Sequence, residues 1–357
     1  MQIAGILSGA SNIPQAVHVY RITMPLGYIN KHTKHKAYWV SAQNCATDLT
    51  EVQFNTLLSS DIIVLGRMIT NDVRGAHELL TLLASRGATL VYETDDDLTE
   101  EYRDISNGKQ QDCIAFIKHP YVSAVTVSTP HLARQITKHN TGQPVFVRPN
   151  CIETSYWEAV SGKHEREHSG TFNIMLTGSP THGDDWIPAY HGILRILDEH
   201  PEARLLVGGY QPEYVDDERI IPLPFVPYYK YPTMLCEADV VVAAIDPNDP
   251  FNYSKSAVKA MEAWAAKRKL GSGGYGGAAV IATKSEVYHG TVKHAKNGLL
   301  SDHTEGAYYS NLKTLIDNPS LMERLQRRGR HDVIQKHSIH TQYTDWLSVY
   351  NKIRRLQ

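Results

Sequence analysis

The chain of 357 residues is long enough for two domains, because a single domain typically has about 100–200 residues. Hydrophobic residues make up 42% and charged residues 21% of the chain, an ordinary balance for a protein with substantial cores. The formal net charge of −2 shows no global basic excess of the kind that indicates nucleic-acid binding.

The cysteines and the N-terminus indicate the cellular compartment. Four cysteines are scattered without a CxxC pair, which argues against a disulfide framework or a cysteine zinc site and fits a reducing cytosol. Residues 1–8 lack the charged start and long apolar core of a signal peptide and are typical of a first strand. No apolar run approaches the ~20 residues of a membrane span. We therefore expect a cytoplasmic protein, with peripheral membrane association left open.

Apolar runs alternate with helical patterns through the N-terminal half, which predicts a doubly wound parallel sheet. Ligands bind beyond the carboxyl ends of the strands in such sheets. This rule brings Gly9, Arg67, Asn150 and an acidic triplet to one edge. The strands are expected at residues 3–7, 37–40, 61–67, 88–93, 124–128 and 145–147, with helices for example at 77–85 and 130–139.

The acidic triplet, Asp95, Asp96 and Asp97, admits three interpretations. It is a DxD metal site, a polar group that binds acceptor hydroxyls or acts as a base, or a cap for the next helix. Of these, we expect helix capping combined with a polar binding edge.

A compact basic cluster precedes the strand at 37–40. Such a run is usually a solvated helix end, favoured by the helix dipole. The alternative is a contact for an anionic acceptor, such as a phospholipid headgroup, a lipid-linked phosphate or a nucleic-acid backbone. The cluster consists of Lys31, His32, Lys34, His35 and Lys36.

The second half repeats the alternation of strands and helices after a polar, glycine-bounded stretch that is typical of a linker. A glycine-rich loop at 271–277 reads as a flexible insertion, and no GK[ST] ends it as in a P-loop. The strands are expected at 172–176, 204–209, 220–223, 239–246 and 279–283, and the later helices at 304–317, 320–336 and 339–356.

The strand at 239–246 is followed by a polar loop and a helix that Ser254 is expected to cap. Lys255, Lys259 and Glu262 then lie close to one helix face. A helix N-terminus with two lysines beyond a parallel strand suits an anion, and the carboxylate of Glu262 suits ribose hydroxyls. The stretch therefore fits a sugar nucleotide, with a solvated helix face as the alternative.

The stretch from Asp239 to Glu262, continued by residues 279–283, resembles the donor-binding segment of retaining GT-B glycosyltransferases, in particular family 4 (glycosyl transferases group 1). That family carries two glutamates at i and i+8 in this helix, and the second typically holds the nucleotide ribose. Glu262 matches the second position, whereas Ser254 stands at the first, so the motif is incomplete.

Other segments are similar to those of divergent family members. They are the Asn-x-x-Lys-Ser loop with Asn252, Lys255 and Ser256, the Asp-Asp-Asp-Leu segment, and the loop that carries Gly178, Ser179 and His182. In GT-B relatives the nucleobase stacks near the segment that holds Phe225 and Val226.

The resemblance implies the GT-B fold, an α/β fold of two Rossmann-like domains whose parallel sheets face an interdomain cleft. We expect an acceptor domain at 1–157, a linker at 158–170 and a donor domain at 171–338. The C-terminal helix at 339–357 is expected to pack back on the N-terminal domain.

The implied activity is transfer of a hexose, with retention, from a nucleotide diphosphate sugar, UDP-sugar foremost, to a hydroxyl of a glycan or lipid-linked acceptor. Alternatives are a virus-type transferase for a modified DNA base, epimerisation or hydrolysis of the sugar nucleotide, and a degenerate sugar-nucleotide-binding protein. No metal and no cofactor are expected.

The predicted site has three parts. Catalytic roles are assigned to Asp96, Asp97 and His182. Donor binding is assigned to Gly178, Ser179, Phe225, Val226, Asn252, Lys255, Ser256, Lys259 and Glu262. Acceptor binding is assigned to Gly9, Arg67, Lys34 and Lys36.

Overall fold

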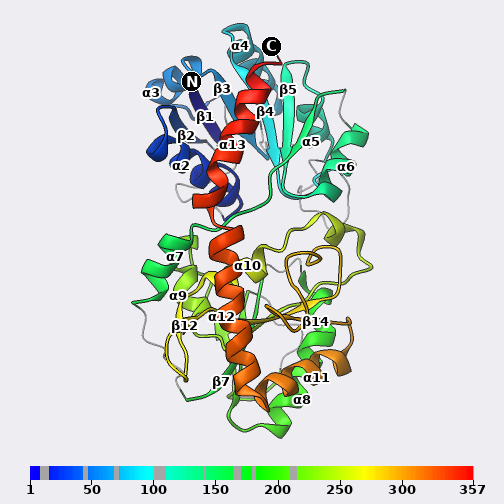
Figure 1. The fold of residues 1–357 in the computed structure, drawn as a ribbon. Coiled ribbons are helices and arrows are strands. Elements are labelled where there is room, and N and C mark those ends of the chain that lie inside the picture. The colour runs from blue at the N-terminus through cyan, green and yellow to red at the C-terminus, as the bar shows by residue number, and fades with distance from the viewer. Residues whose placement is uncertain are drawn as a thin grey trace. The chain divides into compact units, whose positions relative to one another are not determined.

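The computed structural model divides the chain into two compact units (Figure 1). The first comprises Met1–Cys151, Ser254–Ser256 and Ile339–Gln357, and the second comprises Ile152–Tyr253 and Ala257–Ser338. The structure describes residues 1–8, 16–42, 47–67, 72–99, 110–139, 142–163, 170–178, 182–209 and 215–356.

The first unit is built on a six-stranded sheet in the order β2-β1-β3-β4-β5-β6. Every pairing in it is parallel, so all the carboxyl ends lie along one edge. The strands are β1 (Gln2–Ser8), β2 (Lys36–Ala42), β3 (Ile62–Gly66), β4 (Thr89–Thr94), β5 (Val122–Val127) and β6 (Val145–Val147).

Amphipathic helices bury their apolar faces against this sheet. In α4, Ala76, Leu79, Leu80 and Leu83 are buried at the spacing of one helix face. The C-terminal helix α13 packs against α2 and lies along this unit in Figure 1. The helices are α1 (Ala16–His18), a π-helical turn (Val19–Thr23), α2 (Met24–His32), α3 (Glu51–Leu58), α4 (Val73–Ser85), α5 (Gln110–Ile117), α6 (Pro130–His139) and α13 (Ile339–Arg354).

The second unit has its own core and its own six-stranded parallel sheet, in the order β14-β13-β10-β7-β8-β9. The central strand β10 is valine-rich and entirely buried, as expected for a parallel strand covered on both faces. The prediction of two doubly wound parallel sheets is confirmed. The strands are β7 (Phe172–Thr177), β8 (Ala203–Gly208), β9 (Ile220–Leu223), β10 (Val240–Ala243), β13 (Ala279–Thr283) and β14 (Leu299–Ser301).

Helices and short 3-10 turns connect these strands. None of the described helices, in either unit, is long and apolar enough to cross a membrane. The helices are α7 (Thr154–Ser161), α8 (Ile187–Glu199), α9 (Tyr231–Leu235), α10 (Val258–Ala265), α11 (Glu305–Ile316) and α12 (Pro319–Lys336), and the turns are Asp184–Trp186, Tyr228–Lys230 and Pro250–Ser254.

The helix after β10 begins later than the sequence predicts. Ser254 ends a 3-10 turn, and α10 starts at Val258 without a side-chain cap at Ala257. The expectation that Ser254 caps this helix is therefore wrong. As a consequence, Lys259 and Glu262 lie on α10, whereas Lys255 does not.

Two other stretches differ from the expected loops. The first residues of the expected linker, 158–161, belong to α7, where Trp157 and Ser161 are buried. The glycine-rich loop forms a hairpin of β11 (Arg268–Lys269) and β12 (Tyr275–Gly276). Its turn is held against α12, because Arg327 donates to Gly273 O at 2.6 Å and Ser272 N donates to Glu323 at 2.9 Å.

Candidate functional site

A histidine lies at the carboxyl edge of the second unit's sheet. His182 follows β7 and stacks on Trp186, with ring centroids 6.2 Å apart. Its Nδ1 lies 2.9 Å from Oδ2 of the buried Asp185. A carboxylate at this position holds the ring in one orientation and favours the tautomer with hydrogen on Nδ1.

Asp185 also joins two loops of this edge. Its Oδ1 accepts hydrogen bonds from the backbone N of Asp246 at 2.9 Å and from Nδ2 of Asn252 at 2.8 Å. The loop after β7 is therefore fastened to the loop after β10. Asp184 is exposed, and the turn at Asp184–Trp186 has no side-chain cap.

Asn252 lines a small hollow of about 60 Å³ together with Asp246 and Ser285. Its Nδ2 also donates to Asp246 O at 3.0 Å. Oδ1 of Asn252 and Oγ of Ser285 are buried without a hydrogen-bond partner in the described part of the chain. Buried polar atoms are normally satisfied, so the hollow suits a water or a ligand hydroxyl.

Helix α10 supplies a cation and a carboxylate next to the end of β7. Lys259 Nζ donates to the backbone oxygen of Thr177, whose hydroxyl hydrogen-bonds to Tyr231 OH at 2.8 Å. Glu262 follows Lys259 by three residues and is only 6% exposed. Burial, and then the nearby charge of Glu262, raise the pKa of Tyr231. These contacts gather β7, α9 and α10 around one polar cluster of Thr177, Tyr231, Lys259 and Glu262, which we call the α10 cluster.

Glycine is required where β7 and β8 end. A Cβ at Gly178 would lie 2.8 Å from Trp186 and 2.9 Å from His182. Gly209 has a φ of +99°, and a Cβ there would lie 1.9 Å from Gly178 O. The sequence suggests that Gly178 makes room for a diphosphate, but the protein's own side chains already occupy the space beside it.

The remaining donor-side predictions stay untested. Phe225 and Val226 lie just beyond the carboxyl end of β9, where Phe225 is 94% exposed and Val226 is half-buried. Ser179 lies outside the described residues.

In the first unit, an arginine and two acids of the triplet meet at the carboxyl edge. Arg67 follows β3 with a left-handed backbone, φ +55°, which few non-glycine residues adopt. Tyr92 OH donates to Arg67 O at 3.0 Å. The guanidinium forms ion pairs with Asp96, which is in very close contact, and with Asp95 at 3.3 Å.

Burial and charge act against each other in this group. Burial disfavours the charge of Arg67, but Asp96 and Asp95 beside it keep its pKa above the ordinary value. Burial raises the pKa of Asp95, and Arg67 opposes that rise. Asp96 and Asp95 are thus held by an arginine. In the described ranges no group of three or more His, Cys, Asp or Glu side chains is placed to share a metal ion.

Asp97 has a different role from its two neighbours. It is buried, and its Oδ1 accepts from Thr99 N at 3.1 Å and from Thr99 Oγ1 at 2.6 Å. These bonds close a local turn of the kind that Asp favours. Residues 100–109, where the expected helix would begin, lie outside the described part of the chain.

The predicted donor residues Lys255 and Ser256 belong to the first unit, apart from the α10 cluster. Lys255 Nζ lies 3.9 Å from Asp96 Oδ1. Ser256 Oγ accepts from Asn150 Nδ2 at 2.9 Å. Residues 254–256 precede α10 and are not α-helical. Helical spacing placed Lys255 beside Lys259, whereas its neighbour in the structure is Asp96.

Sequence reasoning missed a buried arginine that supports this edge. Arg21, on the π-helical turn, donates to Glu93 at 2.7 Å and to Asn150 Oδ1 at 2.9 Å. Its guanidinium lies 4.8 Å from the ring centroid of Trp346. The available signal was Glu93 itself, because an acid in an apolar parallel strand needs a buried partner.

The acceptor residues expected from the basic cluster lie elsewhere. Lys36 begins β2 opposite Gln2 of β1, so Lys34 and Lys36 lie at the amino edge of the sheet. Arg67 lies at the carboxyl edge. Because all strands run in one direction, these two edges are on opposite sides of the sheet. Gly9 lies outside the described residues.

Comparison with known proteins identifies the fold. No family model matches the sequence, and no curated protein matches it. A sucrose-phosphate synthase from Thermosynechococcus elongatus matches with a TM-score of 0.65 and 13% identity over 100% of both chains. Anabaena HepE in complex with UDP-glucose matches with a TM-score of 0.64 and 13% identity, over 99% of this chain and 100% of that one.

A third match is the trehalose-6-phosphate protein of E. coli bound with UDP-2-fluoro glucose. Its TM-score is 0.64 at 10% identity, over 99% of each chain. Such low identities show a shared fold alone. The chain therefore has the α/β GT-B fold of these glycosyltransferases, as the sequence predicts.

Proposed function

We propose that this protein transfers a hexose, with retention, from a UDP-sugar to a hydroxyl of a glycan or lipid-linked acceptor. The observation that carries the proposal is the α10 cluster, in which Lys259 is fixed against the end of β7 and Glu262 is buried three residues later on the same helix. Similarity in fold to structures that contain UDP and UDP-sugars supports the choice of donor.

The residues of the second unit fit the demands of this reaction. The bond between the sugar's anomeric carbon and the diphosphate oxygen breaks, and negative charge develops on the departing diphosphate. Preorganised cations and dipoles stabilise such charge. Lys259 supplies one donor, and His182 supplies a second through Nε2 when both of its ring nitrogens carry hydrogen. The buried carboxylate of Glu262 accepts hydrogen bonds from the ribose hydroxyls. This proposal needs no metal, because the protein's own cations neutralise the leaving group.

The first unit supplies polar groups for the acceptor in this proposal. Arg67 and Asp96 lie at the carboxyl edge, where ligands of parallel sheets bind. Asp96 serves as the acceptor-side carboxylate, whereas Asp97 holds its own loop through Thr99.

A thermal-shift screen against UDP, GDP, ADP and their sugars tests the donor site. A ligand that binds only the folded state raises Tm with its occupancy, so one nucleotide series is expected to raise it. In a product assay with the preferred sugar nucleotide, Glu262→Gln is expected to lower kcat/KM by about 100-fold. The matched control is Glu218→Gln, an exposed carboxylate of the same unit. Equal activity in both variants would refute the assignment of Glu262.

One observation favours a second function, a sugar-nucleotide-binding protein without catalysis. Ser254 stands where the first glutamate of the related motif is expected, and its carbonyl accepts from Thr129 Oγ1 at 3.0 Å in the first unit. A nucleotide-induced thermal shift without product, across a panel of glycan and lipid-linked acceptors, would favour this function over transfer.

A further inference from the structure

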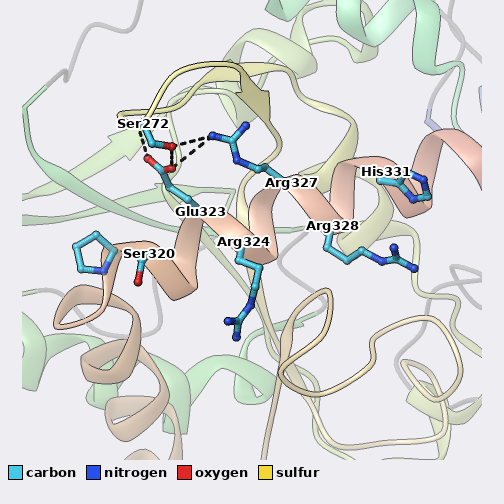
Figure 2. A pocket seen from close by; sticks show the side chains of 8 residues that line it. Ser272, Ser320, Glu323, Arg324, Arg327, Arg328 and His331 are labelled. Atoms are coloured by element: carbon cyan, nitrogen blue, oxygen red, sulfur yellow. Dashed lines mark hydrogen bonds and ion pairs between the residues drawn. The ribbon is translucent and has the colours of Figure 1, made fainter.

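One face of α12 carries a row of basic side chains. Arg324, Arg327, Arg328 and His331 follow each other at i, i+3, i+4 and i+7, the spacing of a single helix face. We call this set the α12 arginine face. It lines an open hollow of about 810 Å³ together with Ser272 of the hairpin turn (Figure 2).

The hairpin fixes one of these arginines. Arg327 donates to Ser272 Oγ at 2.8 Å and to Gly273 O at 2.6 Å. Figure 2 shows Arg327 turned toward Ser272, while Arg324 and Arg328 extend away from it. A guanidinium that is already held loses less side-chain entropy when it binds a ligand.

The acids of α12 are engaged by other groups. Glu323 accepts from Ser272 N at 2.9 Å. The side chain of Asp332 is 4% exposed and accepts from Lys336 at 2.9 Å and from Asn297 Nδ2 at 3.0 Å. Both carboxylates therefore already accept hydrogen bonds from groups outside the arginine face. Glu323 itself lines the hollow, and Asp332 lies 3.7 Å from His331 Nδ1.

An ordinary solvated helix face with i, i+4 ion pairs is the alternative. Such pairs exist, Glu323 to Arg327 at 3.6 Å and Asp332 to Arg328 at 3.5 Å. They leave Arg324 without an acidic partner in the described part of the chain. Moreover, Arg327 and Arg328 are 43% and 52% exposed, so their donors reach the hollow.

We propose that the α12 arginine face binds a flexible polymer that carries phosphate groups. Guanidinium forks match phosphate oxygens in geometry and charge, and Arg324 and His331 are about 10 Å apart along the helix axis, at 1.5 Å per residue. No Phe, Tyr or Trp is among the residues that line the hollow, so it offers no surface for stacking nucleobases. The recognised group is thus the phosphate chain. This site is independent of the proposed sugar transfer.

The test is a titration of the full-length protein with a short linear polyphosphate at two salt concentrations. The double variant Arg324→Gln/Arg328→Gln is expected to bind at least about tenfold more weakly and to reduce the salt slope by about 2, one for each cation removed. The matched control Lys293→Gln/Lys296→Gln removes two exposed charges of the same unit that do not line the hollow, and it is expected to keep the affinity.

Several outcomes would overturn the proposal. Equal losses in both double variants would show binding to net charge alone, and unchanged binding in the α12 variant would exclude this face. Both variants are expected to keep the wild-type Tm, so that a loss of polyphosphate affinity comes from the changed surface and not from unfolding. Binding of an oligothymidylate more tightly than polyphosphate would also contradict the proposal, because it would require base recognition. The UDP-induced thermal shift of the α12 variant is expected to match wild type, which separates this site from the donor site.

Discussion

The two carboxyl edges of this molecule hold their polar side chains in different ways. In the first unit, opposite charges are paired with each other: Arg67 with Asp96 and Asp95, and Arg21 with Glu93. In the second unit, Asp185 binds a histidine, a backbone N–H and an amide, while Lys259 binds a backbone carbonyl. One edge is therefore organised by mutual neutralisation, and the other by hydrogen bonds between loops.

This difference predicts different consequences of mutation. Removing one member of an ion pair leaves an uncompensated charge, so the main effect falls on stability. Removing the centre of a hydrogen-bonded scaffold moves the loops that it joins, so the main effect falls on ligand binding and turnover.

The largest effect is expected from Asp185→Asn. The variant keeps the shape but replaces the acceptor at His182 Nδ1 with a group that can donate, so the ring loses its preferred tautomer and orientation. The rate of the proposed sugar transfer is expected to fall by about 100-fold, with a loss of about 1 kcal/mol in the free energy of unfolding. Steady-state kinetics and urea unfolding measure the two effects.

The neighbouring residue offers the control. Asp184→Asn makes the same chemical change at an exposed position and is expected to alter stability by less than about 0.5 kcal/mol. Similar kinetics for both variants would contradict the role of Asp185 as the residue that positions His182.

A smaller effect on activity and a larger one on stability are expected from Arg67→Gln. Asp95 and Asp96 would lose their cation, which destabilises the fold by about 3 kcal/mol at neutral pH. The loss is expected to shrink as the pH falls, because burial already raises the pKa of Asp95, and the protonated acid does not need the arginine. Urea unfolding at pH 7 and pH 5 checks both statements.

Arg74→Gln is the matched control for this arginine. Its guanidinium is 91% exposed and pairs with Glu78 within one helix, so removing it is expected to change stability little at either pH. If Arg67→Gln changes the free energy of unfolding as little as Arg74→Gln does, the ion pairs of Arg67 with Asp95 and Asp96 do not stabilise the first unit.

The smallest effect concerns His18, buried beside Gly66 and close to Arg67. Burial, and then the charge of Arg67, lower its pKa to about 4. Since an unfolded histidine has a pKa of about 6.5, the unfolded chain takes up a proton first as the pH falls. His18 therefore contributes stability above about pH 6.5 that is lost toward about pH 4, roughly 2 kcal/mol between pH 7 and pH 5.

Comparing wild type with His18→Gln isolates this contribution. The wild-type protein is expected to lose more free energy of unfolding than the variant between pH 7 and pH 5. His289→Gln, at an exposed histidine, is expected to follow wild type. Parallel pH profiles for all three proteins would show that His18 does not titrate in this way.

The strands could be predicted from the sequence because parallel strands buried on both faces are continuous apolar runs. The run at Asp61–Arg67 became β3, and the valines after Asp239 became β10. The start of α10 could not be predicted. Serine is a residue type that often caps helices, but the carbonyl of Ser254 accepts a hydrogen bond from Thr129, which is far away in sequence.

The same limit applies to the candidate site. Lys259 and Glu262 follow from helical spacing, which is local. The partner of His182, Asp185, lies only three residues away, so this contact is local as well. Arg21 and Thr177 depend on contacts with residues far away in sequence. Glu93 indicates that a buried partner is needed, but a single sequence does not say which residue supplies it.

The discontinuous first unit has a consequence for the order of folding during synthesis. Its last segment, α13, buries Trp346, Tyr350 and Ile353 and covers Arg21. Every segment of the second unit has been translated by Ser338, before α13 leaves the ribosome. The unit that begins the chain is therefore the later one to be completed, contrary to the usual N-terminal-first order. A chain truncated after Ser338 would hold every segment of the second unit and a first unit whose buried arginine still lacks its cover.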